Sequence, residues 1–552
     1  MVNALVSVTV PMTQHPGAPA TTPALLATAV ARAPADLAVI DGATRLSYGE
    51  LAELVAAVAG GLIDAGIVPG DRVGIWAPNT YHWIVAALAL HTAGAVLVPV
   101  NTRYLGREAA DVLSRADVRA LFVPDQFLGR SFVNLLRDAT ADEGTGGGTG
   151  PVPGLPSLSL VVAIPVEGTP SAHADGVVSW DALVETGRGV PTDVIRVRGE
   201  AVGPEDPADI LFTSGTTGVP KGAISAHRQT VAVARAWAAR GELSPADRYL
   251  VISPFFHSFG YKAGFIAGLT AGAAMVPQLT FNLEEVLNVI EAERISVLPG
   301  PPTIFQDMLA APERAGRDLS SLRLAVTGSA PVPAVLVERM RAELSFSSVL
   351  TAYGLSEAVV VTMCRREDEP EVIADTSGFP TADFEVRIVN ADGETVGPGV
   401  DGEILLRGPN VMLGYLDDPA ATAAVIDSDG WLRTGDVGRL NDAGYLTITD
   451  RIKNMFTVGG FNVYPAEIEA ALARMNDVIE SAVIGVPDDR LGEVGAVFVV
   501  LRPGATTTPD DVIEYCRANM ANFKVPGSVR VVDALPRNAG GKVVRAELEK
   551  LR

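Results

Sequence analysis

The segment TSGTTGVPKG, from Thr213 to Gly222, decides the fold of this chain. An apolar run, Ile210-Leu211-Phe212, precedes it and predicts a buried strand, and a helical pattern follows from roughly 229 to 239. Glycines allow backbone N–H groups to converge on anionic oxygens, hydroxyl side chains add donors, and Lys221 supplies a compact positive charge. A strand, a loop of this composition and a helix therefore predict a phosphate-binding site.

Two other interpretations of this segment are a Walker A loop and a plain surface turn. A Walker A loop requires Gly-Lys-Ser/Thr, whereas Lys221 lies between Pro220 and Gly222, which disfavours kinases and GTPases of that class. Surface turns rich in Ser and Thr are common. Three glycines, four hydroxyl side chains and a lysine within ten residues are much more specific, so phosphate binding is favoured.

Length and composition indicate a multidomain enzyme. A chain of 552 residues, 48% hydrophobic and 20% charged, exceeds one ordinary core and predicts two or three domains. Its net charge of −22 disfavours nucleic acid and anionic lipid as partners. The longest apolar stretch, 83–100, contains His91, Thr92 and Gly94, and it predicts a buried helix followed by a buried strand rather than a membrane span.

The cysteines and the N-terminal residues bear on the location of the protein. Cys364 and Cys516 fit no zinc or disulfide pattern and are expected to be buried small hydrophobes in a reducing compartment. No basic segment precedes the short apolar run 4–10, so we expect no secretion signal and a cytoplasmic protein. Residues up to about Pro23 are expected to be loosely ordered, and Met12 is an alternative start.

The order of elements along the chain predicts an α/β fold with smaller parts added. Helical and apolar segments alternate from about 25 to 139, which predicts parallel sheets flanked by helices. The Gly/Pro-rich segment 141–156 predicts a flexible surface loop whose absence would change little. Short strands and turns from 384 to 407 predict a small β-barrel or sheet, and about the last hundred residues predict a compact α+β unit.

An aromatic segment and a small-residue segment predict pocket walls. His257, in PFFHSFGYKAG (254–264), follows a predicted strand and is expected to line a site. For its neighbours Phe255 and Phe256, plain core packing is an equally good interpretation. The run Gly328-Ser329-Ala330 follows another predicted strand and suits the close approach of a flat ring to the backbone.

Two carboxylates suit the binding of a metal–nucleotide complex. Glu357 lies in LTAYGLSEA (350–358), and Mg²⁺ takes only one or two carboxylates from protein, with phosphate supplying further oxygens. Asp436 ends GWLRTGD (430–436), where its carboxylate is expected to accept hydrogen bonds from both ribose hydroxyls. The alternative for Asp436 is a solvated turn residue.

These segments, in this order, resemble the adenylate-forming enzymes, which include acyl-CoA synthetases, firefly luciferases and the adenylation domains of peptide synthetases. The resemblance covers about residues 25–552. It implies that ATP activates a carboxylic acid as an acyl-adenylate, with Mg²⁺ as the metal, and that coenzyme A then displaces AMP. Nucleotide contacts are implied for Thr213, Ser214, Gly215, Thr216, Thr217, Gly218, Lys221, Gly328, Ser329, Ala330, Tyr353, Gly354, Ser356, Asp436, Arg451 and Lys542.

The resemblance also assigns catalysis and the acyl pocket. Thr213 and Glu357 are implied as metal ligands and, with Lys542, as catalytic residues, Lys542 bridging the carboxylate and the phosphate. Peptide-synthetase domains carry an aspartate where this chain has His257, which argues against an α-amino acid substrate. The acyl pocket is implied at His257, Phe256, Gly328 and Gly354.

Domain boundaries follow from the resemblance as well. It implies an N-terminal adenylation domain over 1–450, a hinge over 451–454 centred on Lys453, and a small mobile α+β lid over 455–552. The loop with Gly459 and Gly460 would then help to form the tunnel for coenzyme A.

Three positions depart from the pattern of the family. Ser356 replaces a threonine and keeps the hydroxyl, and Asn454 replaces an acidic residue, which puts the side-chain contacts of the hinge in doubt. The usual Pro-Lys-Thr before the catalytic lysine is Pro-Arg-Asn (536–538) here, with the spacing to Lys542 retained.

Within the family the chain is most similar to actinobacterial CoA ligases of steroid breakdown. Those enzymes activate the propanoate side chain on the indanedione that remains after rings A and B are degraded. A medium-chain fatty acyl-CoA or aryl-CoA ligase stays open, as does an adenylation protein that loads a carrier phosphopantetheine. A homodimer is compatible with the sequence. The similarity lies in AHRQ (226–229), PFFHSFGYKAG (254–264), LPGPPTIFQ (298–306) and GGFNVYPAEIEAALARM (459–475).

Overall fold

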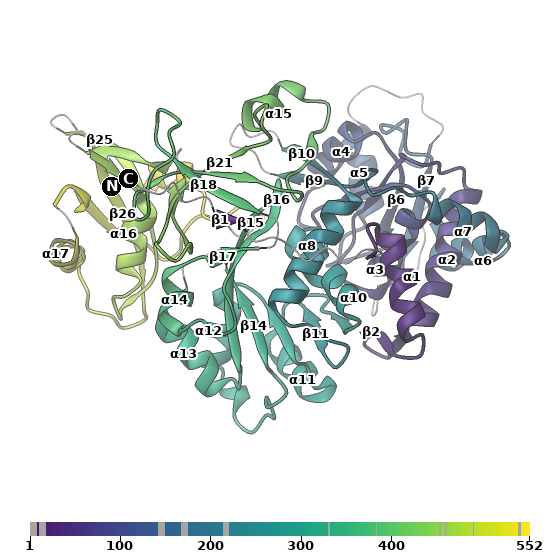
Figure 1. The fold of residues 1–552 in the computed structure, drawn as a ribbon, viewed down its shortest axis with the longest axis horizontal. Helices are drawn as coiled ribbons and strands as arrows, with labels where there is room; N and C mark the ends of the chain where they lie inside the picture. Colours follow the sequence, from purple (N-terminus) through teal and green to yellow (C-terminus); the bar gives the residue numbers. More distant parts are fainter. Residues whose placement is uncertain are drawn as a thin grey trace.

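The computed structural model describes residues 8–9, 18–141, 150–166, 175–213, 220–328, 332–381, 384–451, 454–458, 461–488, 491–520, 522–538 and 542–551. Within these residues the chain forms four β-sheets with helices packed against them. Figure 1 shows that the C-terminal strands lie at the opposite end of the molecule from α6 and α7. The expected α/β fold, with a large N-terminal part and a small C-terminal part, is confirmed.

The first sheet has eight strands in the order β20-β10-β9-β5-β4-β6-β7-β8. Its centre is parallel, and at one edge β10 pairs antiparallel with both β9 and β20. The strands are β4 (Arg72–Ile75), β5 (Val96–Pro99), β6 (Val118–Pro124), β7 (Leu160–Ile164), β8 (Val178–Ser179), β9 (Pro207–Thr213), β10 (Lys221–Ala226) and β20 (Gly414–Tyr415).

The second sheet has nine strands in the order β17-β16-β15-β14-β13-β11-β12-β2-β3. The run from β15 to β2 is parallel, and hairpins add antiparallel strands at both edges. The strands are β2 (Leu37–Asp41), β3 (Thr44–Ser47), β11 (Arg248–Val251), β12 (Ala274–Pro277), β13 (Val297–Pro299), β14 (Leu324–Thr327), β15 (Ser348–Leu355), β16 (Ala358–Met363) and β17 (Phe379–Pro380).

Helices cover these sheets, and local sequence explains where they begin. A capping box starts α2, because the Ser47 hydroxyl accepts from the Glu50 amide while the Glu50 carboxylate accepts from the Ser47 amide. The helix α3 is buried along its whole length from 82 to 91, as the apolar sequence predicted. The longer helices are α1 (Thr22–Arg32), α2 (Tyr48–Asp64), α3 (Tyr81–Thr92), α4 (Gly106–Arg115), α5 (Phe132–Ala141), α6 (Trp180–Arg188), α7 (Thr192–Glu200), α8 (His227–Arg240), α11 (Leu283–Glu293), α12 (Pro302–Ala310), α13 (Ala334–Glu343), α16 (Pro465–Leu472) and α17 (Pro509–Asn519).

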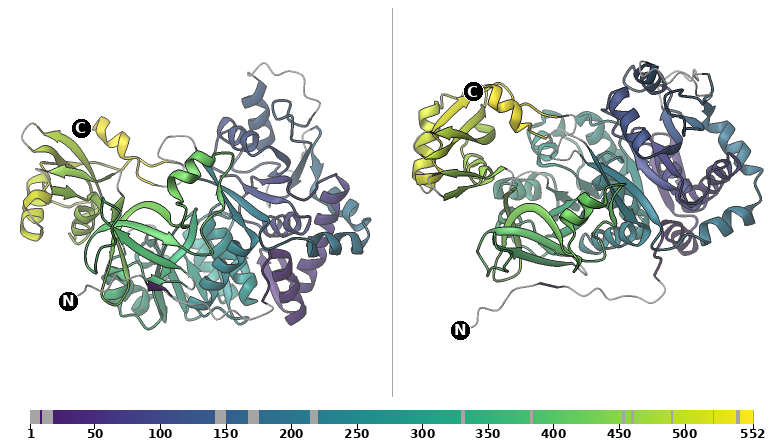
Figure 2. Two further views of the ribbon diagram at one scale, coloured as in Figure 1. Left: turned by 45° about the horizontal axis from the view of Figure 1, so that its top comes forward. Right: turned by 90° about the horizontal axis from the view of Figure 1, so that it is seen from above.

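Two five-stranded sheets complete the fold. The third sheet, which the sequence predicted from its short strands, has the order β1-β18-β19-β21-β22. The fourth lies in the C-terminal unit, and Figure 2 shows this unit beside the third sheet in both views. The strands are β1 (Val8–Thr9), β18 (Glu385–Val389), β19 (Gly402–Arg407), β21 (Leu432–Leu440), β22 (Leu446–Arg451), β23 (Phe456–Val458), β24 (Phe461–Val463), β25 (Val478–Asp488), β26 (Gly492–Leu501) and β27 (Ser528–Val531).

Two expectations about order along the chain need correction. Residues up to Pro23 are not uniformly loose, because Val8–Thr9 pairs with β18 and Thr22, at the start of α1, is fully buried. Residues 142–149 of the Gly/Pro-rich segment 141–156 lie outside the described residues, but Val152 and Leu155 pack into the hydrophobic core beside the first sheet, so the end of the segment is not a plain surface loop. Both cysteines are free and buried, as predicted.

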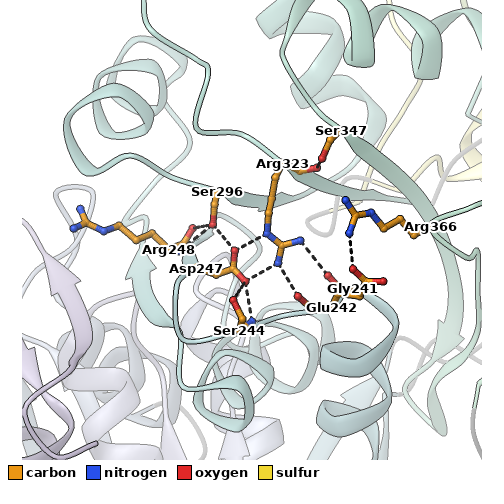
Figure 3. Close-up of polar contacts among 9 residues, drawn as sticks. All are labelled: Gly241, Glu242, Ser244, Asp247, Arg248, Ser296, Arg323, Ser347 and Arg366. Carbon is orange, nitrogen blue, oxygen red and sulfur yellow. Dashed lines mark hydrogen bonds and ion pairs between the residues drawn. The ribbon is translucent and has the colours of Figure 1, made fainter.

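A polar network ties together the amino ends of the parallel strands in the second sheet (Figure 3). Arg323, just before β14, donates to Asp247 through Nε at 2.6 Å and Nη2 at 2.5 Å. The hydroxyl of Ser296, just before β13, donates to the same carboxylate at 2.7 Å, and the Ser244 amide donates at 2.8 Å. Burial opposes ionisation of Asp247, but these hydrogen bonds outweigh it and lower the pKa of its carboxyl.

Asp247→Asn is expected to lower the free energy of unfolding by about 2 kcal/mol at pH 7, because Arg323 loses a buried charged partner. The pKa of Asp247 is lowered in the folded state. Its contribution is therefore present above the ordinary aspartate pKa and lost as the pH falls through the folded value. Urea denaturation followed by circular dichroism measures the change. Asp193→Asn, which removes an exposed pair with Arg196, should move the midpoint little, and equal effects of the two variants would contradict the prediction.

Candidate active site

Three of the predicted site segments lie at one edge of the second sheet. The strands β11, β13, β14 and β15 run parallel, so their carboxyl ends lie at the same edge. The segment with His257 follows β11, Gly328 follows β14, and Tyr353 lies near the end of β15. Open α/β sheets bind ligands in the crevice outside the carboxyl ends of their strands.

The phosphate loop joins two antiparallel strands of the first sheet. Thr213 ends β9 and Lys221 begins β10, and the two residues pair across the ladder. The Thr213 hydroxyl donates to the Lys221 carbonyl oxygen at 3.4 Å. The predicted helix is confirmed as α8 (His227–Arg240), but the strand β10, which the sequence did not predict, lies between it and the loop. The loop therefore does not lead directly into a helix N-terminus, whose dipole would favour a bound phosphate.

One β-hairpin, between β15 and β16, carries four of the predicted residues: Tyr353, Gly354, Ser356 and Glu357. The strand β15 continues past the edge of the parallel run and turns back into β16, and Ser356 and Glu357 form the turn. A Cβ at Gly354 would lie 2.5 Å from the Val360 nitrogen, so the close approach of the two strands requires glycine there.

Asp436 links this hairpin to the third sheet. The Tyr353 hydroxyl donates to Asp436 Oδ2 at 2.6 Å, and Asp436 pairs with Arg451 across β21 and β22. Asp436 is only 3% exposed and lies within a strand, so the alternative of a solvated turn residue is wrong. Three predicted nucleotide contacts, from two different sheets, therefore lie together.

Tyr415, which the sequence did not single out, lies between the phosphate loop and Glu357. Its hydroxyl donates to Glu357 Oε1 at 2.9 Å, and Lys221 Nζ lies 5.1 Å from the centre of its ring. Burial, and next the charge of Glu357, raise the pKa of Tyr415 far above its ordinary value. The hydroxyl therefore stays protonated and is the donor of this hydrogen bond. No motif signal marks this residue, because its partners lie far away in the sequence.

His257, in the segment after β11, lies within electrostatic reach of Lys542. Burial, and next the positive charge of Lys542, lower the pKa of the His257 imidazole to about 4. The structure therefore brings Lys542, from the C-terminal unit, towards the predicted acyl pocket.

Asn79, also missed by the sequence, holds the segment that presents His257. Its side-chain amide donates to the carbonyl oxygens of Val251 at 3.2 Å and Ser253 at 2.9 Å, and its Oδ1 accepts from the Phe255 amide at 2.8 Å. Phe255 is fully buried, so core packing is the correct interpretation for it. Phe256 is half-buried and stays a candidate for the pocket wall.

Glu357 fits a metal that is shared with a nucleotide. Its carboxylate is half-buried, and one oxygen is already engaged by Tyr415. Across the described ranges no group of three or more His, Cys, Asp or Glu residues could hold a metal ion. A cation at Glu357 must therefore take its other ligands from phosphate, hydroxyls or water, as Mg²⁺ does in nucleotide sites.

Other predicted positions are not described by the structure, and their roles stay predictions. These include the hinge residue, the tunnel glycines and most of the phosphate loop. The side chain of Arg451 also belongs to this group, although its backbone is described. The positions outside the described residues are Ser214, Gly215, Thr216, Thr217, Gly218, Ser329, Ala330, Lys453, Gly459 and Gly460.

Comparison with known protein families identifies the chain. The pattern of the AMP-binding enzymes matches residues 26–416, and that of the AMP-binding enzyme C-terminal domain matches residues 467–542. The chain belongs to the AMP-binding enzyme family. Its nucleotide-contact candidates from Thr213 to Tyr353 and its C-terminal Lys542 fall within the matched ranges.

Relatives within the AMP-binding enzymes narrow the activity. Proteins of Rhodococcus jostii and Mycobacterium tuberculosis, both named 3-[(3aS,4S,7aS)-7a-methyl-1,5-dioxo-octahydro-1H-inden-4-yl]propanoyl:CoA ligase, are 51% and 52% identical to this chain. Each match covers 96% of this chain and 99% of the relative. Like these AMP-binding enzymes, the chain is an AMP-forming acyl-CoA ligase that uses ATP, Mg²⁺ and coenzyme A.

Solved structures of AMP-binding enzymes share the fold. ATP-bound MatB from Rhodopseudomonas palustris superposes with a TM-score of 0.82 at 28% identity, over 96% of this chain and 99% of that one. The anthranilate CoA ligase AuaEII, in complex with anthranoyl-AMP, gives a TM-score of 0.84 at 25% identity, over 96% and 97% of the two chains. No helix in the described part of the chain is both long and apolar enough to cross a bilayer.

Proposed function

We propose that this acyl-CoA ligase acts on the indanedione propanoate of steroid breakdown. The observation that carries the proposal is the similarity to two ligases named for that substrate, at 51% and 52% identity over 96% of the chain. Medium-chain acyl-CoA ligases are more distant, at 31% to 33% identity. The buried, free cysteines agree with a reducing compartment, and we place the enzyme in the cytoplasm.

The roles of the site residues follow from their contacts. Asp436 would bind the ribose hydroxyls and Tyr353 would lie against the adenine, once nucleotide displaces their mutual hydrogen bond. Lys221 and the Thr213 hydroxyl would bind phosphate at the mouth of the loop, with Arg451 close to the ribose. Glu357 would hold Mg²⁺, which neutralises charge on the phosphates when bound.

Acyl-adenylate formation needs a cation beside the two reacting anions. A carboxylate and a phosphate repel each other, and negative charge collects on the phosphate oxygens as the bond forms. We assign this task to Lys542, whose charge already acts on His257 at the predicted acyl pocket. The neutral His257 imidazole, with its pKa held near 4, would line the carboxylate end of the acyl pocket without adding charge.

The second step needs a movement of the C-terminal unit. A thiol must reach the carbon that Lys542 covers during adenylation, so the loop with Lys542 has to leave. We propose a large domain over 1–450, a hinge over 451–454 at Lys453 and a lid over 455–552. Rotation about this hinge would present the loop with Gly459 and Gly460 to the site, where it would border the path of coenzyme A.

AMP formation across a panel of acids tests the substrate. With ATP, Mg²⁺ and coenzyme A present, we expect the indanedione propanoate to exceed octanoate, palmitate and benzoate by at least about 10-fold in kcat/KM. Amino acids should give no turnover, because His257 offers no carboxylate for an ammonium group. A preference for octanoate or benzoate would retain the ligase chemistry and reject the steroid-derived substrate.

A further inference from the structure

The segment 411–416 joins the return strand of the phosphate loop to the hairpin with Glu357. The Leu416 amide donates to the Gly222 carbonyl oxygen at 2.8 Å, next to the loop. The Met412 amide donates to the Glu357 carbonyl oxygen, also at 2.8 Å. Backbone bonds therefore fix this segment against both elements, although neither is its neighbour in sequence.

The conformation of this segment directs Tyr415 towards Glu357 and Lys221. Gly414 has a φ of 154°, which side chains disfavour, and a Cβ there would lie 3.0 Å from Thr422 Cγ2. The Tyr415 amide donates to the Thr422 hydroxyl, in α15 (Pro419–Val425), at 2.9 Å. The direction of the Tyr415 side chain is thus set by its own backbone.

The two ends of Tyr415 contact different groups of the site. The hydroxyl donates to Glu357 Oε1 at 2.9 Å, which restrains the carboxylate and leaves its second oxygen with a defined direction. Lys221 Nζ lies over the ring, 5.1 Å from its centre, which is within the range of a cation–π interaction. Tyr415 is half-buried, and both interactions are stronger there than in open water.

We propose that Tyr415 is a positioning residue that orients Glu357 towards the metal and Lys221 towards the phosphates. This inference rests on the proposed roles of Glu357 and Lys221. Partners that orient a metal ligand typically contribute 10- to 100-fold to metal affinity. Because hydroxyl and ring serve different groups, substitutions can separate the two contributions.

Tyr415→Phe removes the hydroxyl and keeps the ring. In the presence of α,β-methylene-ATP we expect Mn²⁺ to bind about 10-fold more weakly, as measured by electron paramagnetic resonance of free Mn²⁺. Calorimetry should find the metal-free affinity for the analogue little changed. Tyr415→Leu also removes the ring, and it should weaken metal-free analogue binding as well, because Lys221 loses its aromatic partner. Unchanged Mn²⁺ affinity in Tyr415→Phe would overturn the proposal.

Tyr445→Phe is the matched control. Tyr445 also donates to a carboxylate, Asp368 Oδ1 at 2.5 Å, and neither residue is a site candidate, so Mn²⁺ affinity should stay the same. Glu357→Gln tests the metal role of Glu357 separately from the positioning role of Tyr415. If it leaves Mn²⁺ affinity unchanged, the metal role of Glu357 fails. If it weakens Mn²⁺ binding and Tyr415→Phe adds a further full loss in that background, the role of Tyr415 does not act through Glu357.

Discussion

Lys542→Ala is expected to slow acyl-adenylate formation by about 10²- to 10³-fold, the typical effect of removing one preorganised charge-stabilising group. The reason is that Lys542, whose charge already acts on His257, would stand between the acid and the α-phosphate. The second half-reaction should be largely retained, because the thiol attacks only after the lysine has left. Pyrophosphate release measures the first step, and AMP release from supplied acyl-adenylate and coenzyme A measures the second.

Two further measurements make this expectation specific. Lys550→Ala removes an exposed lysine of the same C-terminal unit, paired with Glu547 at 2.7 Å, and should leave both half-reactions unchanged. The pKa of His257 is lowered first by burial and then by Lys542, so it should rise above about 4 in Lys542→Ala, as followed by NMR titration of the imidazole. Equal loss in both half-reactions would contradict the moving lid.

The alternation of apolar and helical segments was enough to predict the large α/β core, because each buried element carries its own signal. Residues 83–100 are an example, since a helix and a strand that are apolar over most of their surface are expected to be buried. The strand β10 (221–226) was missed because its sequence, KGAISA, has small residues and weak periodicity. Its pairing with β9 and β20 comes from tertiary contacts that a single segment does not reveal.

The site residues also fall into those that the sequence marked and those that only the fold brings together. Asp436 and Glu357 were predicted because a carboxylate in a specific motif limits the chemistry that it can perform. Tyr415 and Asn79 were missed because their roles depend on partners distant in sequence. Tyr415 contacts Glu357 across 58 positions, and Asn79 contacts the strand end before His257 across more than 170. Only the folded chain brings such residues together.

A second large effect is expected at a buried ion pair between the two large sheets. Lys262 Nζ lies 2.9 Å from Asp209 Oδ1, and both side chains are at most 1% exposed. Lys262 also donates to the Ser225 hydroxyl at 2.8 Å, and Asp209 Oδ2 accepts from the Thr230 hydroxyl at 2.8 Å. Burial lowers the pKa of Lys262, and Asp209 counteracts only part of that shift. The pair joins β9, which ends at the phosphate loop, to the helical turn after His257.

Lys262→Met is expected to lower the free energy of unfolding by about 3 to 5 kcal/mol, because Asp209 keeps its buried position and loses its cation. The double variant Lys262→Met/Asp209→Asn should recover much of this loss, since it removes the uncompensated charge and keeps an acceptor for Thr230. Urea denaturation of both variants, with Arg196→Met as an exposed control, measures the difference. If the single variant were no less stable than the double variant, the loss of stability would come from the packing of the long Lys262 side chain. The ion pair would then not be the interaction that holds the two sheets together near the phosphate loop.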